Sequence, residues 1–480
     1  MADKKVVNSE IAPLMFEYFE EICKIPHGSE NEAEIASYIE NFAKSRGLEC
    51  VKDEANNVLV RKAGTAGREN EPWLMLQGHT DMVCEKDGNV KHEFTKDPLK
   101  LYVDSEGFLR AKGTTLGADD GIAVAAMLAV LDGAIDSHPP IECLFTAGEE
   151  IGMIGAGKFD FSTLKSRRMI NVDSETEGVA VVGCAGGVRS EMTLQVTREP
   201  KQGQCLLVKL GGLAGGHSGE DINKGRLNAN RLMGRLLTEL SFKIDFAVSS
   251  INGGSKDNAI PRECVAELCV PDFFEALYEI ESIAKIISRE ISCDDKGFYC
   301  TVEHCDFDTV VSGVDTWRLM VSLNNTPCGI IEMSRDVQGL VEWSANLGVV
   351  ETTDENVKFT FLTRSGIDDR IDFSIHALDR FAELIDADTG HFGRYTGWSY
   401  AKVSPIRDAY LKAYKELFGK EASCQIIHAG LECGLIRSHI PDMDIISIGP
   451  DIIALHSPGE KLNIASAERL WILLEYMLKN

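Results

Sequence analysis

The chain has 480 residues, which is too long for one hydrophobic core of ordinary size, so we expect at least two domains. Hydrophobic residues make up 44% and charged residues 26% of the chain, proportions typical of globular proteins rather than disordered ones. The 49 basic and 75 acidic side chains give a formal net charge of −26, which excludes nucleic acid and anionic membrane surfaces as expected partners.

The chain shows no pattern of a secretory leader or a membrane span. Its first residues, MADKKVVNSEIAPLMFEYFEE, lack an apolar core and are rich in acid. No run reaches the ~18 consecutive apolar residues of a spanning helix. The 14 cysteines are scattered without a CxxC pair, a usage typical of reduced thiols. We therefore expect a cytoplasmic protein.

The first third of the chain alternates predicted helices and strands. A helix is expected over AEIASYIENFAKSRG, residues 33–47, after the capping-box pattern formed by Ser29 and Glu32. Apolar runs predict three strands and one further helix, at residues 73–77, 141–147, 168–173 and 121–133, respectively. This succession predicts a parallel sheet covered by helices.

From about residue 187 to 401 the predicted strands become longer and more polar. Two segments, which begin LLVKLGGLAGGHSG and VKFTFLTRSG, share a strand, a loop and an amphipathic helix, and this indicates a duplicated β–α unit. The α/β pattern then returns: Ser404 and Pro405 open a helix, DIISIG predicts a strand, and AERLWILLEYMLKN predicts a final helix. We predict an α/β catalytic domain (1–186 plus 402–480) with a mixed, mostly parallel sheet, interrupted by an inserted α+β lid domain (187–401).

Acidic and histidine side chains follow the predicted strands of the α/β part. They are His79 and Asp81 in QGHTDMV, Asp119 and Asp120 in GADDG, Glu149 and Glu150 in AGEEIG, Asp173 in NVDSE and His456 in ALHSPGE. Each alone has an ordinary alternative as a helix cap or a solvated polar residue. Together they fall at the carboxyl ends of strands, where open α/β sheets bind ligands.

Carboxylate and imidazole ligands without thiolates suit zinc or manganese, and two such ions need a shared carboxylate to offset their repulsion. A pair of ions can lower the pKa of a shared water and polarise a scissile carbonyl. The pattern therefore predicts a dinuclear hydrolytic centre with an acidic residue beside it as the base.

The motifs GHTDMV, GADDG, AGEEIG, NVDSE and ALHSPGE resemble, in order and context, those of the M20 family of dinuclear zinc peptidases over essentially the whole chain. Within that family, LMLQGHTDMVCEK, GTTLGADDGI, INVDSETEG and HAGLECG are most similar to the bacterial aminoacyl-histidine dipeptidases, also called cytosol non-specific dipeptidases. The resemblance implies two divalent ions per chain, zinc first, with manganese or cobalt as alternatives.

The resemblance also implies which residues hold these ions. His79 and Asp173 would bind one metal, Glu150 and His456 the other, and Asp119 would bridge both.

Three neighbouring residues take supporting roles by the same resemblance. Asp81 would orient His79, and Glu149 would be the general base for a metal-bridging water. A cis peptide bond is expected between Asp119 and Asp120.

Substrate-binding residues are also implied. His217 would stabilise the oxyanion from the inserted domain, and Asn258 and Arg364 would hold the carboxylate end of the substrate. Glu432 would meet its free ammonium, and His428 would either line the pocket or pack.

The implied function is hydrolysis of unblocked dipeptides, including Xaa-His dipeptides such as carnosine, by a homodimer formed through the inserted domain. Two alternatives within the family are a tripeptidase and an N-acyl amino acid deacylase. A clan-related aminopeptidase would carry a smaller insert. From another class, a non-catalytic binding protein could retain the fold.

Overall fold

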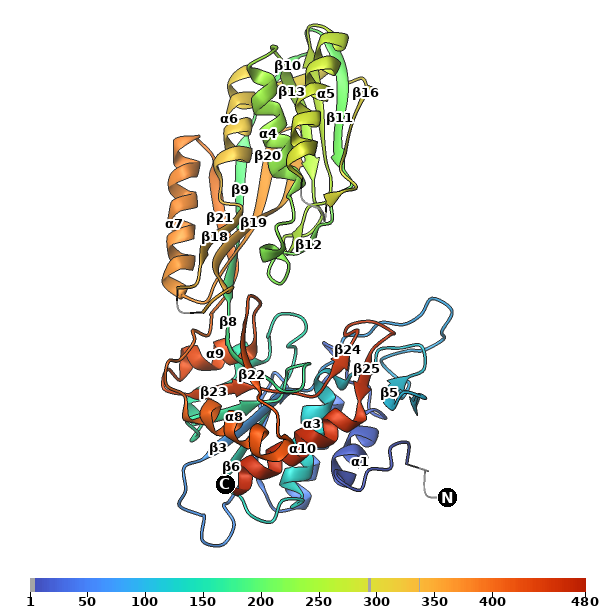
Figure 1. Cartoon of the computed structure of the whole chain (residues 1–480), viewed down its shortest axis with the longest axis vertical. Helices are drawn as coiled ribbons and strands as arrows, with labels where there is room; N and C mark the ends of the chain where they lie inside the picture. The colour runs from blue at the N-terminus through green and yellow to red at the C-terminus, as the bar shows by residue number, and fades with distance from the viewer. Residues whose placement is uncertain (1–4, 292–294, 336) are drawn as a thin grey trace. The chain divides into compact units, whose positions relative to one another are not determined.

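The computed structural model describes residues 5–291, 295–335 and 337–480. The chain forms two compact units (Figure 1). Unit 1 comprises Met1–Gly183, Tyr400–Ile426 and Leu431–Asn480, and unit 2 comprises Cys184–Ser399 and Ile427–Gly430. Unit 2 is therefore inserted into unit 1, and the short segment 427–430 belongs to it although unit 1 flanks that segment on both sides.

Unit 1 is built on an eight-stranded mixed sheet. Its strands, in spatial order, are β1 (Glu49–Lys52), β2 (Val58–Lys62), β6 (Ile141–Thr146), β3 (Leu74–His79), β7 (Arg168–Asn171), β23 (Asp444–Ser447), β8 (Val179–Cys184) and β22 (Ser423–Ile427). The central strands β6, β3, β7 and β23 are parallel, whereas β1, β2 and β8 pair antiparallel at the sides. The predicted α/β fold with a mostly parallel sheet is confirmed.

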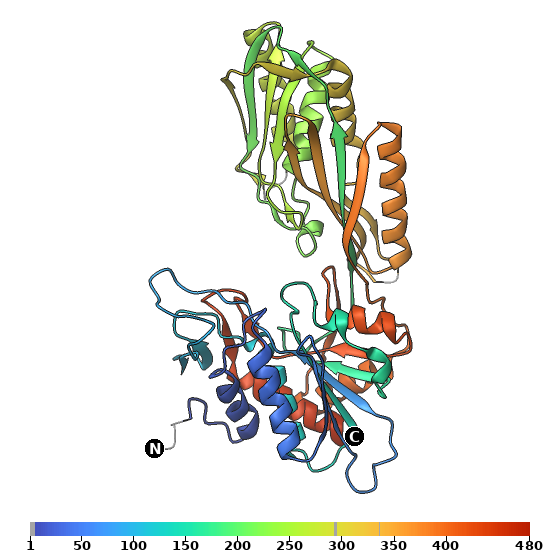
Figure 2. The same cartoon turned by 180° about the vertical axis from the view of Figure 1, so that it is seen from behind.

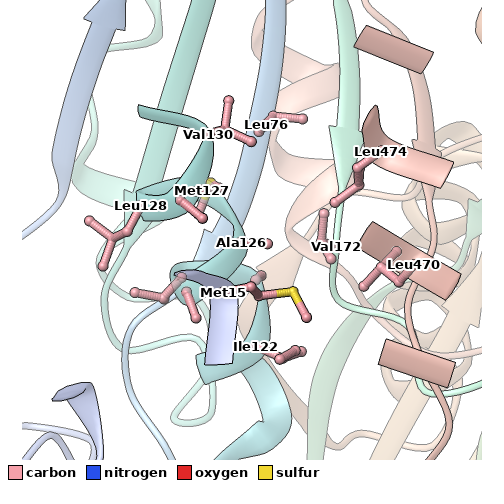
Figure 3. Packing of buried hydrophobic residues seen from close by; sticks show 14 of the residues in the cluster. Met15, Leu76, Ile122, Ala126, Met127, Leu128, Val130, Val172, Leu470 and Leu474 are labelled. Carbon is pink, nitrogen blue, oxygen red and sulfur yellow. The ribbon is translucent and has the colours of Figure 1, made fainter. Parts of the chain in front are cut away.

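The helices of unit 1 bury apolar faces around this sheet. They are α1 (Pro13–Ile22), α2 (Ala33–Ser45), α3 (Ala118–Leu131), α8 (Pro405–Phe418), α9 (Glu432–His439) and α10 (Ile464–Lys479), with single turns η1 (Ala156–Lys158) and η2 (Phe161–Thr163). Helix α3 is almost entirely buried because it consists mainly of Ala, Val, Leu and Met. It contributes half of the residues labelled in the core cluster of Figure 3, which also includes Met15 of α1, Leu76 of β3 and Leu470 of α10.

The helix predicted at 33–47 is present, but its capping box is not. Glu32 occupies the N-cap position of α2 without a side-chain cap. The Ser29 hydroxyl instead donates to Asp81 Oδ2 at 2.8 Å, and the Glu32 carboxylate accepts from the main-chain N–H of Glu30 at 3.0 Å. The capping-box prediction is wrong because a buried carboxylate competes for the Ser29 hydroxyl. The Ser404 cap of α8 is confirmed.

A small second sheet in unit 1 joins segments that are far apart in the sequence. Its strands are β24 (Ile452–Ile453), β25 (Lys461–Asn463), β5 (Phe108–Ala111) and β4 (Leu101–Val103). Strand β25 pairs antiparallel with β5. Residues 112–118 follow β5 and lead to Asp119, and residues 454–460 precede β25 and contain His456.

Unit 2 has a nine-stranded sheet whose eight-strand path is β16 (Tyr299–His304), β11 (Gln204–Gly211), β15 (Cys264–Val270), β13 (Ala247–Gly253), β19 (Val341–Thr352), β20 (Asn356–Ser365), β9 (Gly186–Gln195) and β21 (Asp388–Tyr395), with β18 (Gly329–Met333) beside β19. Two short ladders join β10 (Arg198–Pro200) to β17 (Thr309–Val311) and β12 (Gly216–His217) to β14 (Ala259–Ile260).

The described residues of unit 2 also form the helices α4 (Ala229–Ser241), α5 (Phe273–Glu290), α6 (Gly313–Asn325) and α7 (Asp368–Leu384) and the single turn η3 (Ile222–Lys224). Helices α4, α5 and α6 lie in front of the sheet in Figure 1 and behind it in Figure 2. Both predicted strand–loop–helix segments are present, as β11 to α4 and as β20 to α7. Among the described residues, no helix has the length and apolarity that crossing a membrane requires.

Candidate metal centre

The parallel strands of unit 1 bring the predicted ligands to one edge of the sheet. His79 ends β3 and lies beside Thr146, which ends β6, while Gln77 lies beside Asn171 of β7. The loop that follows β6 carries the two glutamates, and Asp173 lies two residues beyond β7. Carboxyl ends of parallel strands share one edge, so these side chains meet there.

The five predicted ligands form one continuous series. His79 Nε2 lies 3.6 Å from Asp173 Oδ1 and 3.0 Å from Asp119 Oδ1. The other Asp119 oxygen, Oδ2, lies 3.2 Å from His456 Nε2, which in turn lies 3.0 Å from Glu150 Oε1. Asp119 thus directs one oxygen toward each histidine, which is the arrangement that a bridging carboxylate requires.

The donor atoms are clustered as ligands of divalent cations would be, and hydrogen bonds among them do not satisfy all of them. Glu150 Oε1 is buried and has no hydrogen bond of acceptable geometry among the described residues, although His456 Nε2 is 3.0 Å away. Two groups each place three ligand atoms within 4.8 Å of one another, namely His79, Asp120 and Asp173, and His79, Asp119 and Glu150. Oxygen and imidazole donors without sulfur suit zinc or manganese.

Asp120 lies in the first of these groups, although the motif alone favoured its neighbour. Its Oδ2 accepts a hydrogen bond from the main-chain N–H of His79 at 3.1 Å, and its side chain is buried. The peptide bond between Asp119 and Asp120 is cis, as the resemblance implied. The Asp120 carboxylate therefore holds the main chain of His79, one of the predicted ligands, through this hydrogen bond.

In the metal-free protein, raised pKa values favour the protonated forms of His79 and His456, whose positive charge offsets the negative charge of the carboxylates. The nearby carboxylates of Asp119 and Glu150 raise the pKa of His456 to about 10, and burial raises the pKa of Asp173 to about 6. Burial opposes the charged form of His79, but its carboxylate neighbours raise its pKa well above the usual range. Because metal ligands must be deprotonated, a bound cation would displace these protons.

Asp81 contacts both His79 and the loop that carries the two glutamates. Its main-chain carbonyl accepts from His79 Nδ1 at 3.0 Å, while its carboxylate lies 3.5 Å from that nitrogen. The carboxylate accepts from the main-chain N–H groups of Glu149 and Glu150 at 3.1 and 3.3 Å. Asp81 therefore supports a ligand and the Glu149–Glu150 turn at once, and the second contact had no signal in the sequence.

Glu149 lies beside the ligand series without joining it. Its enclosed position raises the pKa of Glu149 well above the usual range, and the nearby Asp173 and Glu432 carboxylates add to this rise. A carboxylate with a raised pKa next to a cation site is suited to accept a proton.

Glu432, at the start of α9, is a fully buried carboxylate at the same edge of the sheet (0% exposed). Its Oε2 accepts from Gln77 Nε2 at 2.6 Å and from the Thr146 hydroxyl at 2.7 Å. Its Oε1 is buried and has no hydrogen-bond partner in the described part of the chain. Burial raises the pKa of Glu432 to about 7. The hydrogen-bonding capacity of Glu432 Oε1 is therefore not used by any residue that the structure describes.

Sequence reasoning missed the side chains that hold Glu432. Gln77 precedes His79 by two residues, and Asn171 precedes Asp173 by two. Because side chains two residues apart in extended chain lie on the same face, Gln77 and Asn171 are expected on the face that carries His79 and Asp173. Asn171 donates to Gln77 Oε1 at 2.7 Å. The alternation of the strands contained this signal.

The remaining predicted residues gather in unit 2. The Arg364 guanidinium is 5% exposed, donates to the Tyr395 hydroxyl at 2.7 Å, and lies 3.5 Å from His217 Nε2. Its Nε has no partner among the described residues. Asn258 lies next to the His217 strand, because its carbonyl accepts from the N–H of Ser218 at 2.8 Å. Burial, followed by the charge of Arg364, lowers the pKa of His217.

His428 lies in the segment Ile427–Gly430, which belongs to unit 2 although unit 1 flanks it on both sides. Its Nε2 lies 2.7 Å from the Ser344 hydroxyl. Burial and the charges of Arg364 and His217 lower the pKa of His428 to about 3. The histidine is therefore held neutral within the packed interior.

This neutral histidine should make the chain sensitive to acid. In the unfolded chain His428 protonates near its usual pKa of about 6.5, so the unfolded state binds more protons between that pH and the folded pKa of about 3. The contribution of neutral His428 to the free energy of unfolding is therefore fully present above about pH 6.5. It decreases as the pH drops, by roughly 2 to 3 kcal/mol at about pH 4.5. Urea unfolding of the chelator-treated protein at pH 7 and about pH 4.5 should show a smaller loss in His428→Gln. The exposed His376→Gln serves as the matched control, and an equal loss in wild type and His428→Gln would refute the assignment.

Three carboxylates and two imidazoles at the carboxyl edge of parallel strands are an arrangement typical of metallohydrolases. The chain belongs to peptidase family M20/M25/M40, which it matches over residues 75–480. The family resemblance of the motifs is thus confirmed.

Two relatives match the chain over nearly its whole length with sequence identities of 37% and 40%. It is 40% identical to the cytosol non-specific dipeptidase of Escherichia coli (strain K12), over 98% of each chain. It is similar to the crystal structure of the aminoacylhistidine dipeptidase from Vibrio alginolyticus, with a TM-score of 0.91 and 37% identity over 98% of each chain. A tripeptidase from Staphylococcus aureus shares the fold at a TM-score of 0.55 and 17% identity, over 99% of this chain and 98% of that one.

Proposed function

We propose that the chain is a metal-dependent dipeptidase that hydrolyses unblocked dipeptides, including Xaa-His dipeptides. The observation that carries this proposal is the series Asp173–His79–Asp119–His456–Glu150, whose neighbouring ligand atoms lie 3.0–3.6 Å apart, with Glu149 beside it. The activities named for the two full-length relatives support the substrate class. Unit 1 is the catalytic domain and unit 2 the lid domain in this proposal.

The five ligands would hold two divalent ions, with His79 and Asp173 on one, Glu150 and His456 on the other, and Asp119 on both. Two bound ions would supply Lewis acidity, activating water and polarising the scissile carbonyl. Zinc is the proposed metal, with manganese or cobalt as alternatives, because imidazole and carboxylate ligands suit it and the motifs resemble those of zinc peptidases.

Glu149 acts as the general base and then as the general acid. Its carboxylate takes a proton from the attacking water and then delivers that proton to the nitrogen of the leaving amine. Asp81 keeps the base in place, because its carboxylate accepts from the main-chain N–H of Glu149 at 3.1 Å. The raised pKa of Glu149 favours the first transfer.

The chain offers groups of opposite charge for the two ends of a dipeptide. In unit 1, the unpartnered Oε1 of Glu432 suits the substrate ammonium. In unit 2, the buried Arg364 guanidinium suits the carboxylate, with Asn258 nearby, and neutral His217 can donate to the oxyanion. An unblocked dipeptide carries one ammonium and one carboxylate, which are the charges that these two groups suit.

The proposal also includes a homodimer formed through unit 2 in the cytoplasm. Helices α6 and α7 of this unit expose Val314, Trp317, Phe373 and Leu384, which a second copy would cover. The cytosolic location in the name of the Escherichia coli relative supports the compartment.

A panel of matched substrates tests this function. Zinc-loaded protein should hydrolyse Ala-His at least about 100-fold more efficiently, in kcat/KM, than N-acetyl-Ala-His or Ala-His-Ala, because acetylation removes the ammonium and the added residue moves the carboxylate away from the scissile bond. Carnosine tests the tolerance for a displaced ammonium. Hydrolysis restricted to the acylated compound would indicate a deacylase, preference for Ala-His-Ala a tripeptidase, and no hydrolysis a binding protein.

A further inference from the structure

Glu460 is a buried carboxylate without a cationic partner. Its side chain is 3% exposed, and in the part of the chain that the structure describes no lysine, arginine or histidine pairs with it. An isolated buried carboxylate is costly unless hydrogen bonds stabilise it. Its position, four residues after the ligand His456, makes its partners informative.

Those partners are consecutive main-chain N–H groups that lead to the bridging ligand. Glu460 Oε2 accepts from Leu116 at 2.7 Å and from Gly117 at 3.1 Å. Its Oε1 accepts from Ala118 at 2.8 Å and, at the long distance of 3.5 Å, from Asp119 itself. Gly117 has a φ of 67°, a left-handed conformation that glycine adopts freely and that turns these N–H groups toward one point.

The main chain of Glu460 belongs to the loop that carries the second histidine ligand, so the carboxylate ties that loop to residues 116–119. The N–H of Glu460 donates to the carbonyl of Ser457 at 3.0 Å, which closes the turn after His456. His456 has a φ of 56°, an uncommon conformation for a residue with a side chain, so its loop depends on such anchors. Immediately after Glu460, β25 pairs with β5, the strand from which the 112–118 segment departs.

We propose that Glu460 is a positioning residue of the metal centre, which fixes the main chain under Asp119 and locks it to the His456 loop so that the ligands are preformed. This inference rests on the proposed dinuclear centre. Partners behind metal ligands typically change metal affinity by about 10- to 100-fold when removed.

Glu142 provides a matched control for a merely structural role. It is likewise a fully buried carboxylate of unit 1 (0% exposed) that accepts main-chain N–H groups, from Lys165 at 3.0 Å and Ser166 at 2.8 Å, and it also pairs with Arg61 at 2.9 Å. It lies at the amino end of β6, away from the edge where the ligands gather. Replacement of either glutamate by glutamine removes one acceptor oxygen and one charge.

The test measures zinc affinity by competition with a chromophoric chelator in metal-free wild type, Glu460→Gln and Glu142→Gln. Glu460→Gln should bind zinc about 10- to 100-fold more weakly and should shift the visible absorption of bound cobalt. Glu142→Gln should keep its affinity within about twofold, although the melting temperature of both metal-free variants falls.

Wild-type affinity in Glu460→Gln, or an equal loss in both variants, would overturn the positioning role. If Glu460→Gln does not fold, Glu460→Asp, which retains the charge on a shorter side chain, should still weaken zinc binding by at least about threefold, and unchanged binding would overturn the role. The number of zinc ions bound by wild type tests the proposed centre separately from this ratio.

Discussion

Replacing Glu149 by glutamine should lower kcat by about 10³-fold while the protein still binds its full complement of metal. Glutamine has nearly the shape of glutamate but cannot take a proton from water, and general-base contributions are typically about 10²- to 10⁴-fold. The ligand series does not include Glu149, so its geometry should persist. Hydrolysis of Ala-His and metal content by mass spectrometry measure the two effects on the same sample.

The adjacent Glu150→Gln is the matched control. The main-chain N–H groups of both residues are held by the Asp81 carboxylate, at 3.1 Å for Glu149 and 3.3 Å for Glu150, so both variants disturb the same turn. Only Glu150 contributes an oxygen to the ligand series. Glu150→Gln should therefore lose metal, whereas Glu149→Gln should not. Equal metal loss in both variants would contradict this division of roles.

The fold was largely predictable because its signals are local. The apolar runs that become β3, β6, β7 and α3 are bounded by polar residues, and their order permits few topologies. The capping box at Ser29 failed because its competitor, Asp81, is distant in sequence. No local pattern could show that the Ser29 hydroxyl has a better acceptor.

The residues of the candidate site divide in the same way. His79, Asp119 and Asp173 stand in short motifs at strand or helix ends, where sequence reasoning is strong. The supports behind them are long-range: Glu460 reaches the N–H of Leu116, and Gln77 reaches Glu432. Strand alternation places Gln77 on the side of the site, but the distant segment that each of these groups contacts depends on which loops the fold brings together.

The placement of His428 shows the same limit at the level of domains. Its segment, Ile427–Gly430, follows β22 of unit 1 along the chain but packs in unit 2, where His428 contacts Ser344. Composition shifts locate a long insert, as the change near residue 187 did, but a four-residue return to that insert leaves no compositional trace.

Loss of Asp119, the proposed bridging carboxylate, should have the second large effect. Asp119 directs its two oxygens to His79 at 3.0 Å and to His456 at 3.2 Å, so it contributes to both halves of the centre. Asparagine at this position keeps one oxygen and removes the charge that offsets the repulsion between two cations. Asp119→Asn should bind fewer than two metal ions per chain and lose about 10³-fold or more of the activity.

Zinc titration of the metal-free protein tests the central claim most directly. Hydrolysis of Ala-His and bound zinc are followed together in wild type, with Asp119→Asn as the control. We predict that activity is absent without metal and reaches its plateau only when two zinc ions are bound per chain. Full activity in the metal-free protein, or a plateau at one ion per chain, would contradict a dinuclear centre built from these five ligands.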